Sequence, residues 1–240
     1  MGSSSASSPE RYSLAVTETR LRQAQMLTGT VFTLFLSLHL LNLLAAIVSA
    51  EAYNQVQSVL RGMYQNPLGE TLLVFVPLTI HIYCSLRLRW LRRRKRPSPV
   101  AVRQRLQRLA GWFLLLAIAG HVLATRGASL FYGIHPGFEG LSFTLWYLPG
   151  YFYPYYFLLA LAGFYHGLAG VAQAIPHLTG TCRWLRPVRL QGVLTSAAAA
   201  GFLWGLLGLG GTFYDTPFPP DSEYARLAAS LFGLDIGEPF

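Results

Sequence analysis

Charged residues are scarce in this chain of 240 residues. They make up 12% of the sequence, whereas an ordinary soluble domain carries about 25%, and hydrophobic residues make up 52%. The few charges are clustered, so long stretches of the chain carry none. This composition argues against a soluble globular protein and predicts an integral membrane domain without a separate soluble domain.

Five tracts that are nearly free of charge are long enough to cross a bilayer, which takes about 20 apolar residues. They cover roughly residues 26–48, 68–90, 108–126, 148–174 and 190–212. Two prolines, Pro149 and Pro154, predict a break at the start of the fourth tract. We therefore expect an all-α membrane protein, with a polar N-terminal segment over 1–25, a five-helix transmembrane domain over 26–212 and a tail over 213–240.

Acidic residues are fewer than basic ones, 10 against 19, and most basic residues gather on one side of the predicted membrane. Ten of them lie between Arg87 and Arg108, in the connection of the second and third tracts. Three more precede the first tract, and three lie between the fourth and the fifth. Because Lys and Arg mark the inner side of a membrane, the pattern predicts an inner N-terminus and, after five crossings, an outer C-terminus. It also accounts for the net charge of +9 without nucleic acid as a partner.

Cysteines and intramembrane acids are nearly absent. The two cysteines, Cys84 and Cys182, match neither a disulfide framework nor the spacing of metal ligands. No Asp or Glu lies deep in any tract, which argues against a proton pump or an ion-coupled carrier, because these relay through intramembrane acids. A copper or zinc transporter would need carboxylates or thiols along its path.

An internal repeat is present. The segments QMLTGTVFTLFLSLH (25–39) and QRLAGWFLLLAIAGH (107–121) both read Gln-x-Leu-x-Gly, then nine residues, then His, at an offset of 82 residues. The second tract carries His81 and the fourth carries His166, which lie 85 residues apart. The first four helices therefore resemble two copies of one helical hairpin, each helix with one histidine.

The four histidines fall at two depths. Measured along a helix from the nearest inner anchor, His39 and His121 lie roughly 26 and 20 Å deep, whereas His81 and His166 lie roughly 9 and 15 Å deep. An imidazole inside a bilayer is costly, and it indicates a functional site unless a hydrogen bond between helices satisfies it. One histidine is readily explained by such a bond; four on consecutive helices are not.

Two imidazoles that face each other across a bundle suit bis-axial ligation of a b-type haem, which leaves no open position on the iron and points to electron transfer. A structural zinc ion would instead need four ligands at one level. The repeated glycines, Gly29 and Gly111, would admit either a macrocycle or a neighbouring helix. In the fifth tract, Gly201 and Gly205 have the spacing of helix packing, within the bundle or against a partner.

The connections on the outer side differ in character. Residues 49–67 predict a short surface helix, and residues 127–150, rich in glycine and aromatics, predict an interfacial loop. The stretch EYARLAASLFG in the tail predicts a short amphipathic helix. His135 and His177 lie outside the apolar tracts and are expected to be surface residues.

This pattern resembles the dihaem cytochrome b subunit of succinate:quinone oxidoreductases and fumarate reductases, over roughly residues 20–212. The residues that carry the resemblance are Leu27, Gly29 and His39, their counterparts Leu109, Gly111 and His121, and the remaining histidines His81 and His166.

The resemblance implies an outer haem b on His39 and His121 and an inner haem b on His81 and His166. It implies two partners on the inner face, a flavoprotein with covalent FAD and an iron–sulfur protein, and a membrane quinone as substrate. The dicarboxylate site of this oxidoreductase would lie on a partner and not on this chain. The resemblance allows a dimer of the complex, and it suggests a bacterial inner membrane, with the mitochondrial inner membrane as the alternative.

Two further positions bear on the reaction. Some fumarate-reducing members of the family carry a glutamate two residues before the fourth ligand, proposed to pass protons, and Phe164 stands there in this chain. That difference favours succinate oxidation. Glu70, at the outer start of the second tract, is a candidate to bond a quinone oxygen; its alternative role is to favour a helix N-terminus in NPLGE.

Two other classes of protein stay open. One is another dihaem membrane cytochrome b, of the ascorbate-dependent type or from a formate dehydrogenase or hydrogenase. The other is a transporter or assembly protein without haem, which would hold its histidines by hydrogen bonds.

Overall fold

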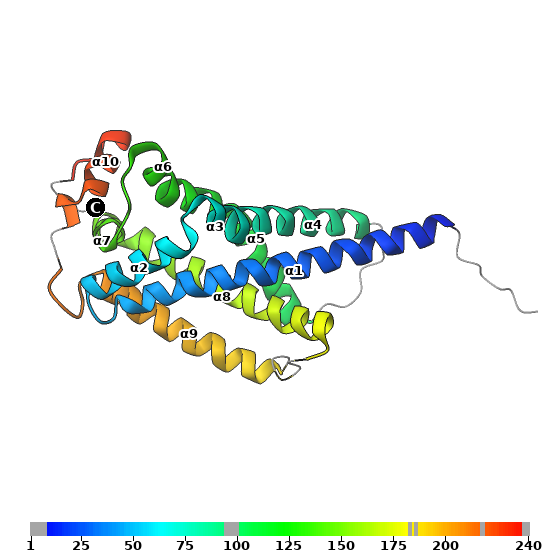
Figure 1. Cartoon of the computed structure of the whole chain (residues 1–240). Helices are drawn as coiled ribbons and strands as arrows, with labels where there is room; N and C mark the ends of the chain where they lie inside the picture. Colours follow the sequence, from blue (N-terminus) through cyan, green and yellow to red (C-terminus); the bar gives the residue numbers. More distant parts are fainter. Residues whose placement is uncertain (1–8, 94–100, 182–183, 185–186, 217–218, 237–240) are drawn as a thin grey trace, which may run out of the picture.

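The computed structural model describes residues 9–93, 101–181, 184, 187–216 and 219–236. All regular structure in these residues is helical, and five helical stretches are long and apolar enough to cross a membrane (Figure 1). The predicted all-helical fold with five membrane-length helices is confirmed. The stretches are α1 (Pro9–Ala45); α3 (Pro67–Gly69) with the π-helix η1 (Glu70–Phe75) and α4 (Val76–Arg92); α5 (Val102–Val122) with the π-helix η2 (Leu123–Gly127) and α6 (Ala128–Tyr132); α8 (Pro149–Thr179); and α9 (Val188–Leu209).

The first helix begins earlier than its apolar tract. Helix α1 has 37 residues and spans about 55 Å, nearly twice the hydrocarbon thickness of about 30 Å. From Pro9 onwards, the segment predicted as a polar N-terminal region is therefore part of α1, and it projects past the other helices (Figure 1). The reason is local: Pro9 is favoured in a first turn, and no further Pro or Gly occurs before Gly29.

The predicted break at the start of the fourth tract is wrong, because α8 runs from Pro149 through Pro154 without interruption. The first four N–H groups of a helix have no intrahelical acceptor, so Pro149 removes no hydrogen bond. Pro154 removes one backbone hydrogen bond near the N-terminal end of α8, and the helix continues beyond it to Thr179.

The predicted interfacial loop over 127–150 is also wrong, because it contains α6 and a buried helix, α7 (Phe138–Tyr147). The N-terminus of α7 is capped by a side chain from α2 (Ala50–Tyr64): Phe138 N donates to Asn54 Oδ1 at 2.9 Å. A cap supplied from another helix leaves no local signal in the sequence. The two predicted short helices are confirmed as α2 and α10 (Glu223–Phe232).

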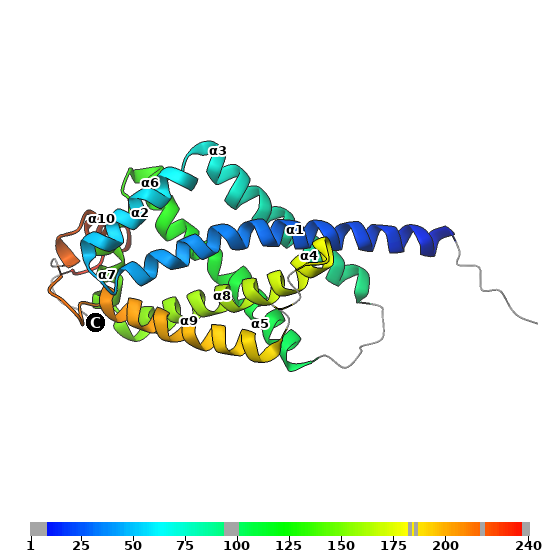
Figure 2. The same cartoon turned by 60° about the horizontal axis from the view of Figure 1, so that its bottom comes forward.

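The bundle is built around α1 and α8. Helix α1 packs against α2, α4, α8 and α9, and α8 packs against α5 as well as α9 (Figure 2). Helices α2, α6, α7 and α10 gather at one end, which we call the loop end. The opposite end, where α1 begins, α4 ends and α5 begins, carries most of the arginines, and we call it the basic end.

The outside of the bundle is apolar. In the most apolar window of each membrane-length helix only 11–33% of the residues are buried, and large side chains such as Leu34, Leu116 and Val193 are exposed. A surface of this kind is unfavourable in water and suited to lipid, while the helices satisfy their own backbone groups.

Glycines allow α9 to approach α1 closely. A Cβ atom on Gly201 would lie 3.1 Å from the Leu44 side chain, and one on Gly205 would lie 2.5 Å from the backbone oxygen of Leu43. These glycines therefore serve packing within the bundle.

Gly205→Ala should lower the free energy of unfolding by about 1–3 kcal/mol, because the added Cβ forces α9 away from α1. The matched control is Gly192→Ala in the same helix, whose Cβ would meet nothing within 4 Å. The control should be neutral or stabilising by up to about 1 kcal/mol through helix propensity. Thermal unfolding of the detergent-solubilised protein, followed by circular dichroism, measures both; equal effects would contradict the packing role.

Candidate functional site

The four intramembrane histidines meet as two pairs. His39 on α1 faces His121 on α5, with ring centres 6.0 Å apart and ring planes at 74°. His81 on α4 faces His166 on α8, with ring centres 6.1 Å apart and ring planes at 86°. The structure thus brings together the same residues that the depth estimate grouped at each level. We call them the outer pair and the inner pair.

Both rings of the inner pair are held by a backbone carbonyl of a neighbouring helix. His81 Nδ1 lies 3.0 Å from the oxygen of Gln25, and His166 Nδ1 lies 3.0 Å from the oxygen of Gln107. A carbonyl oxygen only accepts hydrogen bonds, so in each ring Nδ1 carries the proton in this contact. The neutral ring then keeps the lone pair of Nε2 available for a metal, an arrangement typical of metal-binding histidines.

The repeated glycines make room for these two rings. A Cβ atom on Gly29 would lie 2.7 Å from His81 Nδ1, and one on Gly111 would lie 2.9 Å from His166 Cε1. The close neighbour of each glycine is therefore the histidine of an adjacent helix. In the shared Gln-x-Leu-x-Gly motif, the backbone carbonyl of the glutamine is the hydrogen-bond acceptor for the histidine ring. The glycine, one turn later, leaves the space that the ring fills.

The outer pair has aromatic neighbours. The ring of Phe35 stacks on His39 at 5.8 Å, and Tyr64 of α2 meets Phe35 edge-on at 4.8 Å. Thr125 donates to the backbone oxygen of His121 in the π-helical turn that follows it.

Glu70, the predicted quinone-binding candidate, is paired with Arg126. Arg126 binds both carboxylate oxygens, with Nη2 at 2.7 Å from Oε2 and Nε on Oε1, and its Nη1 donates to Ser129. The side chains of Glu70 and Arg126 are 13% and 19% exposed. The pair joins the two π-helices η1 and η2. The helix N-terminus beside Glu70 is capped by Asn66, whose Oδ1 accepts from Gly69 N at 2.8 Å.

Asn42 is a polar residue that the sequence analysis did not single out. It lies one turn beyond His39, is 5% exposed and faces Tyr53, and its Oδ1 accepts no hydrogen bond from the described residues. The sequence could have pointed to Asn42, because it is the only residue with a side-chain amide in the apolar run 26–48. Threonines in that run, such as Thr33, donate to carbonyls of their own helix.

The remaining candidates lie elsewhere. His135 and His177 are exposed, as predicted. Partial desolvation and the nearby charges of Arg61 and Arg126 lower the pKa of His135, which favours the neutral form of its ring. Cys84 is a free, buried thiol on α4, and Cys182 lies outside the described residues.

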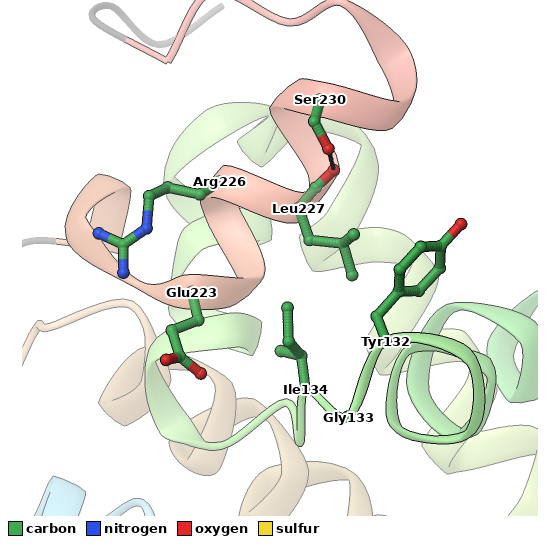
Figure 3. A pocket seen from close by; sticks show the side chains of 7 residues that line it. All are labelled: Tyr132, Gly133, Ile134, Glu223, Arg226, Leu227 and Ser230. Carbon is green, nitrogen blue, oxygen red and sulfur yellow. Dashed lines mark hydrogen bonds between the residues drawn. The ribbon is translucent and has the colours of Figure 1, made fainter.

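A hollow at the loop end lies between the end of α6 and helix α10 (Figure 3), and none of the four intramembrane histidines lines it. Its lining mixes apolar and charged side chains, including Tyr132, Ile134, Glu223, Arg226 and Leu227. Within the described ranges, no group of three or more His, Cys, Asp or Glu side chains converges as in a metal cluster.

Comparisons of the chain with known protein families, with characterised proteins and with solved structures gave no match.

The Glu70–Arg126 pair should stabilise the loop end. Glu70→Gln or Arg126→Gln alone should cost about 3 kcal/mol of unfolding free energy, because each leaves a largely buried charge without its partner. The double variant should cost clearly less than the sum of the two, which a double-mutant cycle by thermal unfolding measures.

The matched control is the Glu18–Arg92 pair at the basic end, a single contact at 3.4 Å whose side chains are 21% and 46% exposed. Its coupling should stay within about 1 kcal/mol. Additive effects at Glu70 and Arg126 would show that their contact contributes no stability.

Proposed function

We propose that this chain is the dihaem cytochrome b subunit of a succinate:quinone oxidoreductase or fumarate reductase. The observation that carries the proposal is the meeting of four intramembrane imidazoles as two facing pairs, each joining two different helices. In this proposal the outer pair holds one haem b and the inner pair holds the other. Bound haem iron supplies one-electron transfer without an open coordination position.

The spacing within each pair supports this assignment. A metal bonded to the facing nitrogens of two imidazoles, at about 2 Å each, holds the ring centres roughly 6 Å apart. The observed separations are 6.0 and 6.1 Å. In the inner pair, the Nδ1 atom of each ring is hydrogen-bonded to a backbone carbonyl. The Nε2 atom of each ring is therefore the one left to bind iron in this proposal.

Two kinds of residue in the repeat position the rings of the inner pair. The Gln25 and Gln107 carbonyls orient the rings of His81 and His166, and the two glycines keep the space for them. The same set of contacts occurs on α1 with α4 and on α5 with α8. This correspondence supports the proposal that the first four membrane helices are two copies of one hairpin.

The distribution of charge supports the orientation and the partners. We take the basic end as the inner side, so that the N-terminus is inside and the C-terminus outside. The flavoprotein and iron–sulfur subunits would then dock on the basic end, where α1 projects beyond the bundle. The proposed membrane is a bacterial inner membrane, with the mitochondrial inner membrane as the alternative.

A quinone would react near the outer pair in this proposal. The polar groups available there are the Glu70–Arg126 pair and Asn42. Arg126 donates to both Glu70 oxygens, but each carboxylate oxygen has a further lone pair, so Glu70 could still accept a hydrogen bond from a quinol hydroxyl.

One observation also suits a bundle without haem. Hydrogen bonds from His81 and His166 to backbone carbonyls would by themselves satisfy these rings between helices. The content of haem therefore decides between the two functions. A copurifying polypeptide with covalent FAD separates the proposed complex from other dihaem cytochromes b.

The purified chain with its partners should contain two b haems, measured as a haem-to-polypeptide ratio from pyridine haemochrome spectra. His39→Ala or His121→Ala should remove the outer haem and keep the inner one, and His81→Ala or His166→Ala should do the converse. Absence of haem from a folded preparation made with adequate haem supply would refute the proposal. Loss of both haems from all four variants would contradict the pairing.

Gly111→Ala should disturb the inner haem alone, because the added Cβ collides with the ring of His166. We expect loss of that haem or a shift of its midpoint potential in a redox titration, with the outer haem unchanged. Gly120→Ala, in the same helix and with nothing within 4 Å of its Cβ, is the control. The same response in both variants would mean that crowding of His166 is not the cause.

A further inference from the structure

One exposed face of α4 changes character along its length. Val76, Ile80 and Tyr83 are all exposed, and they are followed on the same face by Arg87 and Trp90. From Ile80 to Trp90 the helix rises about 15 Å, half of a hydrocarbon core of about 30 Å. The order from aliphatic to aromatic to cationic side chains is the order that one leaflet presents from its middle to its headgroups.

Two arginines stack on the indole at the end of this face. The guanidinium carbon of Arg87 lies 4.4 Å from the ring centre of Trp90, and that of Arg93 lies 4.9 Å from it. Residues 87, 90 and 93 follow each other at helical spacing, so the three side chains form one ladder. Trp90 is nevertheless 49% exposed.

A third arginine extends the cationic surface towards α5. Arg89 lies over the ring of Trp112 at 5.1 Å, although α4 does not pack closely against α5. All of the guanidinium–indole contacts found in the described residues lie at this place.

These arginines keep their charge available. In the described part of the chain, no carboxylate lies within ion-pair distance of Arg87, Arg89 or Arg93, whereas Arg92, on another side of α4, pairs with Glu18. Stacking on an indole holds a guanidinium in place and leaves its N–H donors at the rim free for an anion.

We infer that this face of α4 is a binding site for anionic phospholipid of the inner leaflet. Arg87 and Arg93 donate hydrogen bonds to the phosphate, the Trp90 ring lies at the interface, and the acyl chains run along Tyr83 and Ile80. The site lies on the lateral surface of the bundle, continuous with its lipid-facing side. The inference does not depend on the presence of haem.

Native mass spectrometry of the full-length protein in neutral detergent tests the site. The protein is titrated separately with phosphatidylglycerol and with phosphatidylcholine of the same acyl chains, and lipid adducts are counted. Phosphatidylglycerol should bind more tightly, and Arg87→Gln/Arg93→Gln should reduce its binding by roughly fivefold for each arginine. Phosphatidylcholine binding should be nearly unchanged.

Two further variants distinguish a specific lipid-binding site from non-specific attraction of the lipid to the positive charge of the protein. Arg61→Gln/Arg226→Gln removes two arginines from the loop end and should leave phosphatidylglycerol binding as it was. Trp90→Leu keeps every charge but removes the stacking surface, and it should weaken phosphatidylglycerol binding several-fold. Circular dichroism confirms that each variant is folded.

Four results would overturn the inference. Three of them are equal binding of the two lipids, equal losses in the two double-arginine variants, and no change in Trp90→Leu. If the copurifying subunits abolish phosphatidylglycerol binding, the face is covered by a protein partner and the lipid assignment is wrong.

Discussion

The hydrogen bond from a histidine ring to a backbone carbonyl of the adjacent helix is the contact on which this bundle depends. Within lipid, water does not satisfy a polar ring, so His81 and His166 must find acceptors inside the protein. Gln25 and Gln107 supply those acceptors. Each bond also ties two membrane helices together, α1 with α4 and α5 with α8.

The glycines follow from the same constraint. Gly29 and Gly111 each lie one turn beyond the carbonyl that accepts from the histidine, and a Cβ atom at either position would collide with the ring. They make room for the imidazole rings of His81 and His166. The histidine rings lie in the space that these glycines leave, which is compatible with the role expected for them beside a macrocycle or a neighbouring helix.

The two ends of the molecule differ in how their arginines are bound. At the basic end, arginines stack on exposed indoles, an arrangement suited to headgroups or to a partner protein. At the loop end, short helices fold back over the bundle, and the conspicuous arginine there, Arg126, is held by Glu70 across two π-helices. A buried ion pair needs both members placed together, and here the extra residue in each π-helical turn lies where they meet.

By itself, the sequence determined the class of the fold and the residues of the candidate site. Apolar tracts of membrane length can only be helices, and counting residues from the inner anchors placed His39, His81, His121 and His166 at two depths, because depth along a helix follows from the rise per residue. The tertiary structure alone decided which polar groups satisfy one another. The cap of α7 by Asn54, the partner of Glu70 and the carbonyls that hold the inner histidines all join residues 56 or more positions apart. Such contacts have no local pattern, because they are selected by the way the helices cross and not by the chemistry of any single segment.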